Sequence, residues 1–535
     1  MKAFLMYRDR DFDAQQLLAR REREVRSRTS DKSLDLQQIL PPSEAALTQD
    51  LGLDILFNAM ANGDTFLFEV AKVAVLRGVT DPQIIVYRQR ILRDCLRHAA
   101  IVRAMYQIAI EAITEERKNY WSSFGRYPAG TLHHAVEVLQ MFVGKLKRLR
   151  RIADQYANQF QSNGVLRLFA MLRAELDDDY FAKIGDHLKR LKFRSGVLLS
   201  AELGKGNKGT NYVLRKPNDG ERNWILRVLH GPAGYTFQLH PRDEAGARAL
   251  SELRDQGVNL VANALAQSTD HILSFFHMLR TELAFYVGCL NLHQRLSDLR
   301  EPTCFPVAAP RGARKLSFSG LYDPCLALSM RRQVIGNDVN ADGKDLLIIT
   351  GANTGGKSTF VRSIGLGQLM MQAGMFVAAD RFSAEVQDGL FTHYKREEDV
   401  TMESGKFDEE LRRMSQVVDQ LAPGSMMLFN ESFAATNERE GSEIAMQITS
   451  ALLECDIKVA FVTHLHEFAR VLYEKKMANA MFLRAERLAD GTRTFRLIEA
   501  EPLQTSYGKD LYDDVFGLEP GGMHLPEGRA APVAG

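Results

Sequence analysis

The densest group of residues able to do chemistry is a glycine-rich segment that ends in a lysine and a serine. Residues 351–358 read GANTGGKS, which fits the pattern GxxxxGK[ST]. The apolar run DLLIIT (345–350) precedes it as a buried strand would, and FVRSIGLGQLMMQAG follows with helical spacing and a terminal Gly374. Glycines allow backbone N–H groups to converge on phosphate oxygens. The sequence therefore predicts a Walker A loop; the alternative is a chance glycine-rich turn.

Such a loop predicts a nucleotide site with ATP and Mg²⁺ as cofactors. We expect Lys357 to neutralise the β- and γ-phosphates and act in catalysis, and Ser358 to bind Mg²⁺. The helix N-terminus behind the loop adds a favourable dipole. The residues expected to contact the nucleotide are Gly351, Ala352, Asn353, Thr354, Gly355, Gly356, Lys357, Ser358 and Thr359.

Two further apolar runs end in residues that could activate water. SMMLF (425–429) leads into Asn430 and Glu431, and KVAFVT (458–463) leads into His464. Glu431 has the placement of a general base, and His464 can reach a γ-phosphate. Asn430 stands where most P-loop ATPases carry an Asp that helps to hold the metal. The alternatives are a strand-end salt bridge for Glu431 and a hydrogen-bonded core histidine for His464.

The elements that must position these residues follow from periodicity. Apolar residues recur at helical spacing through 50–194, short β-rich runs fill 195–240, and helical spacing returns over 241–311. Strands and helices alternate over 312–519. We expect a multidomain fold with a helical region, a small inserted antiparallel β segment and an α/β P-loop ATPase domain of the ATP-binding-cassette type. A charged helix and connector (1–49) precede these regions, and a flexible tail (520–535) follows.

Composition excludes several classes of protein. The chain has 535 residues, 45% of them hydrophobic and 25% charged, which is typical of folded domains rather than of a disordered or disulfide-stapled chain. Lys plus Arg (68) almost balances Asp plus Glu (67), so a nucleic-acid site would have to be a local basic patch. We find no stretch of about 18 apolar residues. The five scattered cysteines predict reduced thiols in a cytoplasmic protein.

The segment LLIITGANTGGKSTFVRSIGLGQLMMQAGMFVAA resembles the ATPase domain of the MutS family of DNA mismatch-repair proteins, whose loop usually reads TGPNMGGKST. Glu403 to Phe407, with Glu410 and Leu411, resembles the family's signature segment, and NESFAATNEREG and THLHE match later motifs. Looser similarity extends over 84–95 (IIVYRQRILRDC), over VIGND (334–338) and to PLQTSYG (502–508).

This resemblance implies an ATP-hydrolysing protein that binds duplex DNA, whether mismatched, branched or recombining, as a homodimer with shared ATP sites. It implies that Asn337 lies near the adenine and that the partner supplies Ser404 to the γ-phosphate. It places a DNA-gripping clamp at the β-rich segment. The candidate DNA contacts are Lys205, Lys208, Arg215, Lys216, Lys189, Arg190 and Arg194, with further basic residues at Lys145, Lys147, Arg148, Arg150, Arg151 and Lys192. Solvated helix faces are the ordinary alternative for these charges.

Departures from the family pattern sharpen these expectations. Asn430 predicts weaker Mg²⁺ retention and slow hydrolysis, and Gly405 and Lys406 replace the usual Ser and Thr. No room precedes residue 50 for the family's mismatch-reading domain, so we expect a short member without it, nucleoid-associated if bacterial. A nucleotide-gated protein-interaction switch with weak ATPase activity and no DNA ligand is the alternative function. A nuclease-linked relative is a third, although no added nuclease segment is visible.

Overall fold

The computed structural model describes residues 1–8, 40–122, 128–193, 196–216, 238–352, 355–396, 405–488 and 492–503. The chain divides into two compact units, Met1–Ser33 with Arg90–Val287 and Leu34–Gln89 with Gly288–Gly535. Helices α5 (Pro82–Arg97) and α11 (Glu244–Asp298) each contain one of the boundaries. Most of the charged helix and connector predicted over 1–49 (residues 9–39) and the tail predicted over 520–535 lie outside the described residues.

The first unit is mainly helical. Its helices, besides parts of α5 and α11, are α6 (Ala99–Ser122), α7 (Pro128–Tyr156), η2 (Ala157–Gln159), α8 (Asn163–Glu175) and α9 (Asp178–Arg190). Helix α7 buries apolar residues at three- and four-residue spacing, Leu132, Ala135, Val136 and Leu139 among them. The ring of Phe142 packs on Phe276 of α11 at a centroid distance of 5.4 Å. The helical region predicted from periodicity is therefore present.

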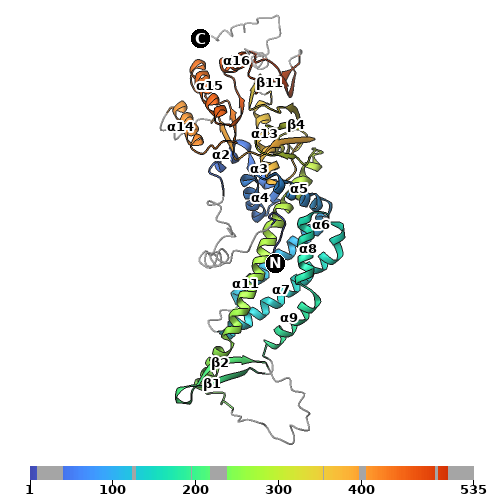
Figure 1. Ribbon diagram of the computed structural model, residues 1–535, viewed down its shortest axis with the longest axis vertical. Helices are drawn as coiled ribbons and strands as arrows, with labels where there is room; N and C mark the ends of the chain where they lie inside the picture. The colour runs from blue at the N-terminus through green and yellow to red at the C-terminus, as the bar shows by residue number, and fades with distance from the viewer. Residues whose placement is uncertain are drawn as a thin grey trace, which may run out of the picture. The chain divides into compact units, whose positions relative to one another are not determined.

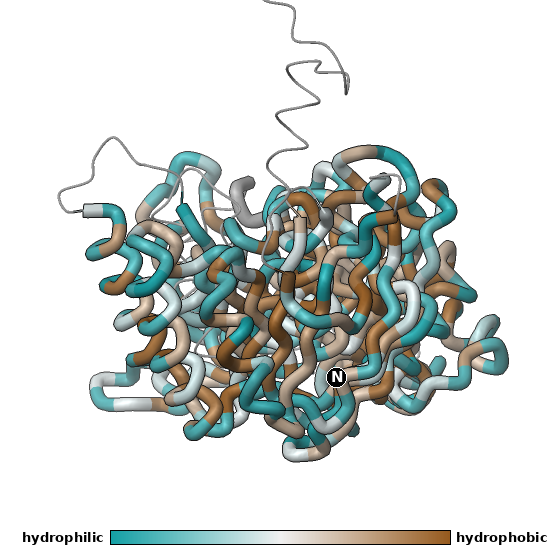
Figure 2. Tube along the Cα trace, turned by 90° about the horizontal axis from the view of Figure 1, so that it is seen from above, coloured by the Kyte–Doolittle hydropathy of each residue, from teal (hydrophilic) through white to brown (hydrophobic). Residues whose placement is uncertain are grey.

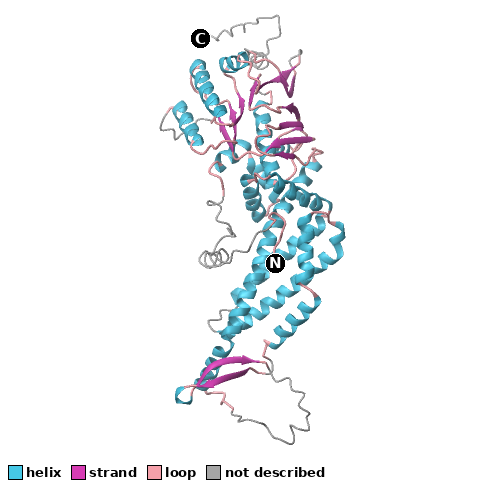
Figure 3. Ribbon diagram, in the orientation of Figure 1, coloured by secondary structure: helices cyan, strands magenta, loops and turns pink. Residues whose placement is uncertain are grey.

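A two-stranded antiparallel sheet interrupts the helices of this unit (Figure 3). Strands β1 (Leu198–Leu203) and β2 (Gly209–Arg215) are joined through the short helix η3 (Lys205–Asn207). Both strands are largely exposed. The further strands predicted in this segment fall mostly on residues 217–237, outside the described part.

The second unit contains a six-stranded sheet in the order β12-β11-β6-β10-β9-β8. Neighbours are parallel except β11 and β12, which pair antiparallel. The strands are β6 (Leu346–Thr350), β8 (Leu390–Tyr394), β9 (Met426–Asn430), β10 (Lys458–Val462), β11 (Ala480–Arg487) and β12 (Arg493–Glu499). The interior residues of the central strands β6, β9 and β10 are apolar and buried, as those of parallel strands usually are, which confirms the strands predicted from DLLIIT, SMMLF and KVAFVT.

A second, four-stranded sheet has the order β3-β7-β4-β5. Its strands are β3 (Val307–Ala309), β4 (Leu316–Leu321), β5 (Asn337–Asn340) and β7 (Arg381–Glu385). Helix α13 (Lys357–Ala373) contacts strands of both sheets and is buried at almost every position from Phe360 onward. It ends at Gly374, as predicted, with the Gly374 N–H bonded to helix carbonyls.

The helices α14 (Lys406–Val418), α15 (Glu438–Glu454) and α16 (His466–Glu474) gather on one side of the six-stranded sheet (Figure 1). Their apolar faces form one core with the strands, which includes Phe429, Phe433, Phe461 and Phe468. Figure 2 shows hydrophobic residues (brown) interspersed with hydrophilic ones (teal) along the trace. The short helices α2 (Glu44–Leu51), α3 (Leu53–Ala61), α4 (Thr65–Arg77) and α12 (Pro324–Met330) also belong to this unit.

The parallel strands place their carboxyl ends at one edge of the sheet. Strand β6 leads there into residues 351–356, β9 into Glu431, and β10 into Thr463 and His464. The fold is thus a multidomain arrangement of helices and mixed sheets that collects the predicted chemistry at one place. Among the described helices, none combines the length and the apolar character needed to cross a membrane.

Candidate active site

The glycine-rich loop connects the end of β6 to the first residue of α13. Gly351 has φ +114°, and a Cβ there would lie 2.9 Å from the backbone nitrogen of Ala485, so a larger residue would not fit. Gly356 is the N-cap of α13. Asn353 and Thr354 lie outside the described residues. Because the loop opens at a helix N-terminus, its amides can face an anion.

Lys357, the first residue of this helix, is almost completely buried. Its Nζ donates to the carbonyl oxygens of Gly351 (2.9 Å) and Ala352 (2.8 Å). Burial lowers the pKa of Lys357 to about 8, and the negative charge of Glu431 opposes part of this shift. The ammonium group therefore lies beside the loop. It can exchange its hydrogen bonds to two carbonyl oxygens for a stronger, charge-assisted hydrogen bond to an anion.

Glu431 and His464 meet at the ends of neighbouring parallel strands. His464 Nε2 lies 3.1 Å from Glu431 Oε1, and both side chains are partly exposed. The hydrogen bond from His464 is the main cause that lowers the pKa of Glu431, and the positive charge of Lys357 adds to it. Glu431 is therefore an ionised carboxylate at neutral pH, as a general base requires.

Ser358 and Asn430 bring two oxygen atoms together beside the loop. The Ser358 hydroxyl donates to Asn430 Oδ1 at 2.9 Å. Hydroxyl and amide oxygens are ligands that Mg²⁺ accepts, together with phosphate oxygens and water. Within the described residues, no group of three or more His, Cys, Asp or Glu side chains could hold a metal ion by itself. The pair fits a Mg²⁺ that enters with a nucleotide, because the phosphates supply the charge that Asn430 lacks.

A cavity of about 550 Å³ connects these groups to an apolar region. Lys357, Ser358 and Glu431 line one part of it, and Ile335 and Phe495 line another. Both apolar side chains are about half exposed, so they give the cavity an accessible apolar wall. Gly355, Gly356 and Thr359 also line the cavity, with Tyr322, Leu326, Met330, Arg332 and Val334 among the remaining residues.

Asn337 lines the same cavity, although its side chain is already engaged. Its Oδ1 accepts from the backbone N–H of Leu497 at 2.7 Å, and its Nδ2 lies 3.5 Å from the carbonyl oxygen of Phe495. It therefore ties β5 to β12 and fixes Phe495 in the wall. Sequence reasoning missed Phe495, which stands as a single aromatic residue in the charged run TRTFRLIE and carries no local signal.

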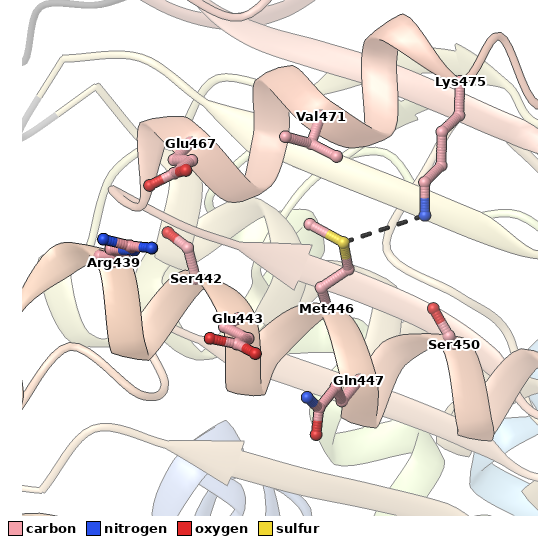
Figure 4. A pocket seen from close by; sticks show the side chains of 9 residues that line it. All are labelled: Arg439, Ser442, Glu443, Met446, Gln447, Ser450, Glu467, Val471 and Lys475. Carbon is pink, nitrogen blue, oxygen red and sulfur yellow. Dashed lines mark hydrogen bonds between the residues drawn. The ribbon is translucent and has the colours of Figure 1, made fainter.

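A second cavity of about 490 Å³ lies between α15 and α16 (Figure 4). Its wall mixes Arg439 and Lys475 with Glu443 and Glu467, and Lys475 Nζ lies 3.9 Å from the sulfur of Met446. Because acidic and basic groups alternate along it, it offers no concentrated positive charge to a triphosphate. None of the predicted site residues lines it, so the cavity beside the loop is the stronger nucleotide candidate.

The predicted DNA contacts lie in the first unit. Lys205, Lys208, Arg215 and Lys216 are exposed in and beside the two-stranded sheet, where Arg215 Nε donates to Ser200 Oγ at 2.8 Å. Lys189 and Arg190 are at the end of α9, and Arg190 pairs with Asp186 at 3.0 Å. Arg194 and Ser404 are outside the described residues.

The basic residues of α7 are largely paired within their own unit. Lys145 lies 3.0 Å from Glu111 and 2.6 Å from Glu115, and Arg148 also contacts Glu111. Arg150 pairs with Asp154 at 3.0 Å. These contacts favour a structural role for this charge run over phosphate binding.

Comparison with known proteins gives two family matches. The MutS2 N-terminal domain model matches residues 80–299, and the MutS domain V model matches residues 347–513. Similar proteins include MutS protein homolog 4 of Homo sapiens, 23% identical over 59% of this chain and 33% of that protein. The DNA mismatch repair protein MutS of Synechococcus sp. (strain CC9902) is 24% identical over 65% of this chain and 39% of its own length. The MutS of Chloroflexus aurantiacus (strain ATCC 29366 / DSM 635 / J-10-fl) is 32% identical over 41% of this chain and 23% of its own. The chain thus spans about a third of the length of the curated relatives that it matches.

Proposed function

The chain is a member of the MutS family, and from this premise we propose that it is an ATP-hydrolysing protein that binds DNA as a dimeric, nucleotide-gated clamp. Its DNA ligand would be mismatched or otherwise unusual duplex, in mismatch repair or recombination. The observation that carries this proposal is the placement of Glu431, paired with His464, in the same cavity as Lys357 and Ser358.

The residues in and beside this cavity would have separate roles in hydrolysis. Lys357 exchanges its bonds to Gly351 and Ala352 for the phosphates, while the loop amides hold their oxygens. Ser358 and Asn430 would hold Mg²⁺, which supplies positive charge to the developing phosphoryl transition state. Glu431 accepts a proton from the attacking water, and His464 orients Glu431. The loop is then a Walker A loop in an ATPase of the ATP-binding-cassette type.

The apolar end of the cavity suits a purine base. Ile335 and Phe495 present half-exposed apolar surface that a flat ring would cover, and Asn337 holds Phe495 in place. The partner of a dimer would complete the site with its signature segment, which includes Ser404. A two-fold arrangement then gives two equivalent shared sites.

Rates of ATP hydrolysis across a Mg²⁺ titration, with and without DNA, test the enzymatic part of the proposal. We expect hydrolysis that needs Mg²⁺ at higher concentration than an Asp-containing relative requires, and that changes when DNA is added. A gel-shift panel of homoduplex, mismatched and junction DNA, with and without ATP, tests the clamp. Equal, weak binding to all three DNAs in every nucleotide state would refute DNA sensing.

A nucleotide-gated protein-interaction switch is the second candidate. The internal pairing of Lys145, Arg148 and Arg150 favours it, because carboxylates of the same unit already partner these charges. The salt dependence of DNA binding separates the two functions. A clamp that contacts several phosphates loses affinity steeply as salt rises, whereas a protein-binding switch shows little DNA affinity to lose.

A further inference from the structure

The three residues that follow β9 form a strained corner. Glu431 has φ +56° and Phe433 has φ +63°, and neither is glycine. A side chain in the left-handed region costs energy, so such a conformation persists only where surrounding contacts hold it. Because Glu431 is the proposed general base, the contacts that stabilise this corner also fix the direction of its side chain.

Three neighbouring elements hold the corner through hydrogen bonds. The N–H of Glu431 donates to the carbonyl oxygen of Val462 on β10 at 2.8 Å. Ser432 Oγ lies 2.8 Å from Nδ1 of His393 and 2.5 Å from its carbonyl oxygen, both on β8. The N–H of Phe433 donates to Oε1 of Glu410 on α14 at 2.7 Å. The corner is therefore fixed residue by residue from three sides.

The protonation of His393 follows from its two neighbours. Its Nε2 lies 3.1 Å from the carbonyl oxygen of Glu410, which can only accept, so Nε2 carries a proton. Burial and the positive charge of Arg413 lower the pKa of His393 to about 4, so the ring is neutral at neutral pH. Its Nδ1 is then an acceptor, so Nδ1 and the His393 carbonyl oxygen compete for the single hydroxyl proton of Ser432. The ring also stacks on Phe433, at a centroid distance of 5.4 Å and an interplanar angle of 18°.

Glu410 is the residue that connects this corner to a different element. It is 5% exposed, and its carboxylate and its carbonyl group both take part, the first with Phe433 and the second with His393. It lies in the second turn of α14 and belongs to the segment that the proposed dimer presents to the partner's nucleotide. A displacement of α14 would therefore reach the backbone beside Glu431 through one hydrogen bond.

We propose that Glu410 is a positioning residue for ATP hydrolysis, which with His393 fixes the corner 431–433 and so couples the position of α14 to the direction of Glu431. This inference rests on the proposed function, in which Glu431 activates water. It assigns the signature segment a second effect, on the subunit that carries it. Engagement of the partner's nucleotide and readiness of the subunit's own base would then change together.

The test compares Glu410→Ala with Glu410→Gln in the full chain. Glutamine keeps an oxygen that accepts from Phe433, whereas alanine leaves a buried N–H without that acceptor. We expect Glu410→Ala to lower kcat at least about 10-fold with the Kd for radiolabelled ATP nearly unchanged, since a small misplacement of a catalytic group is costly. Glu410→Gln should restore most of kcat. Glu409→Ala, one position earlier on α14, is the matched control and should hydrolyse ATP like the parent.

Ser432→Ala independently tests the contacts between the corner and His393. It also replaces Glu410→Ala as the test of the inference if that variant fails to fold. We expect the same loss of kcat with retained ATP binding. A kcat equal to the parent's in Glu410→Ala would overturn the inference. If Glu410→Ala does not fold, a parental kcat in Ser432→Ala would overturn it instead. A Glu410→Gln variant as slow as Glu410→Ala would also overturn it. Parental hydrolysis in Glu431→Ala would instead overturn the proposed function, and the inference with it.

Discussion

Lys357 is the residue whose charge state most directly controls the proposed nucleotide site. Its pKa is lowered to about 8 by burial, so the ammonium form predominates at pH 7 and is lost as the pH rises through that value. Phosphates bind the ammonium form, and above the pKa the protein must take up a proton in order to bind. Lys357 thus links nucleotide affinity to pH on the alkaline side.

We expect ATP affinity to be steady below about pH 8 and to fall by up to about tenfold per pH unit above it. Titration calorimetry from neutral to alkaline pH measures the affinity, and repetition in buffers of different ionisation enthalpy measures the proton uptake. Unchanged affinity through the alkaline range, without proton uptake, would show that Lys357 does not titrate in this way.

Asn430 offers a second test at the residue scale. Its Oδ1 lies 2.9 Å from the Ser358 hydroxyl, where a carboxylate would add a negative charge to the metal site. Two unit charges about 4 Å apart interact by about 4 kcal/mol at an effective dielectric constant near 20, and desolvation reduces the net gain.

We therefore expect Asn430→Asp to lower the Mg²⁺ concentration for half-maximal hydrolysis by roughly tenfold, which corresponds to about 1.4 kcal/mol. Asn437→Asp, at the N-cap of α15, adds the same charge while keeping a good capping residue and serves as the control. The same Mg²⁺ requirement in Asn430→Asp and the parent would remove Asn430 from the metal site.

At the scale of elements, α15 approaches the corner after β9 closely. A Cβ on Gly441 would lie 2.4 Å from the carbonyl oxygen of Phe433, so α15 or the corner would have to move. Overpacking of this kind costs about 1–3 kcal/mol. We expect Gly441→Ala to lower the thermal unfolding temperature and to reduce ATP hydrolysis more than ATP binding.

Gly144 on α7 provides the matched control, because a Cβ there meets nothing within 4 Å. Gly144→Ala should stabilise the protein by up to about 1 kcal/mol through helix propensity alone. If Gly441→Ala were as stable and as active as Gly144→Ala, the close contact between α15 and the corner would not exist in solution.

Local patterns were sufficient to predict the central strands and the helix after the loop. Between a charged first residue and a final threonine, the runs DLLIIT and KVAFVT are apolar, as buried parallel strands are, and Gly374 marks a helix end. The positions of Glu431 and His464, each shortly after an apolar run, could also be predicted. These features depend on residues close together in sequence, whereas the 3.1 Å contact between Glu431 and His464 joins residues 33 positions apart.

Features set by distant pairings could not be predicted in this way. The hydrogen bond from Leu497 to Asn337 joins residues 160 positions apart. The hydrogen bond from Phe433 to Glu410 joins the corner after a strand to a helix, and no repeat of apolar residues in the sequence relates the two. The grouping of α2 to α4 with the sheets likewise could not be predicted, because the boundary between the two units falls inside α5 and not at a break in the helical spacing. Such contacts depend on the whole arrangement of strands and helices.

At the scale of the whole molecule, ATP should hold two copies together, because each copy would complete the other's site. Glu431→Ala removes the proposed base but leaves Lys357 and the loop, so ATP should stay bound without hydrolysis. We expect this variant with ATP and Mg²⁺ to dimerise at least about tenfold more tightly than the parent, which is about 1.4 kcal/mol. Sedimentation velocity measures the association.

Glu454→Ala, at the exposed end of α15, is the control and should associate like the parent. A Glu431→Ala variant that binds ATP and remains monomeric at concentrations where the parent is monomeric would contradict the shared-site arrangement.

Equilibrium binding of radiolabelled ATP to the purified chain and to Lys357→Ala, across a Mg²⁺ titration near neutral pH, is the most direct test of the proposed ATPase. The parent should bind ATP saturably, and Lys357→Ala should lose at least about 100-fold in affinity, because charge-assisted hydrogen bonds to phosphate are lost. A parent chain that takes up no ATP at any Mg²⁺ concentration, or a variant that binds as tightly as the parent, would contradict the account.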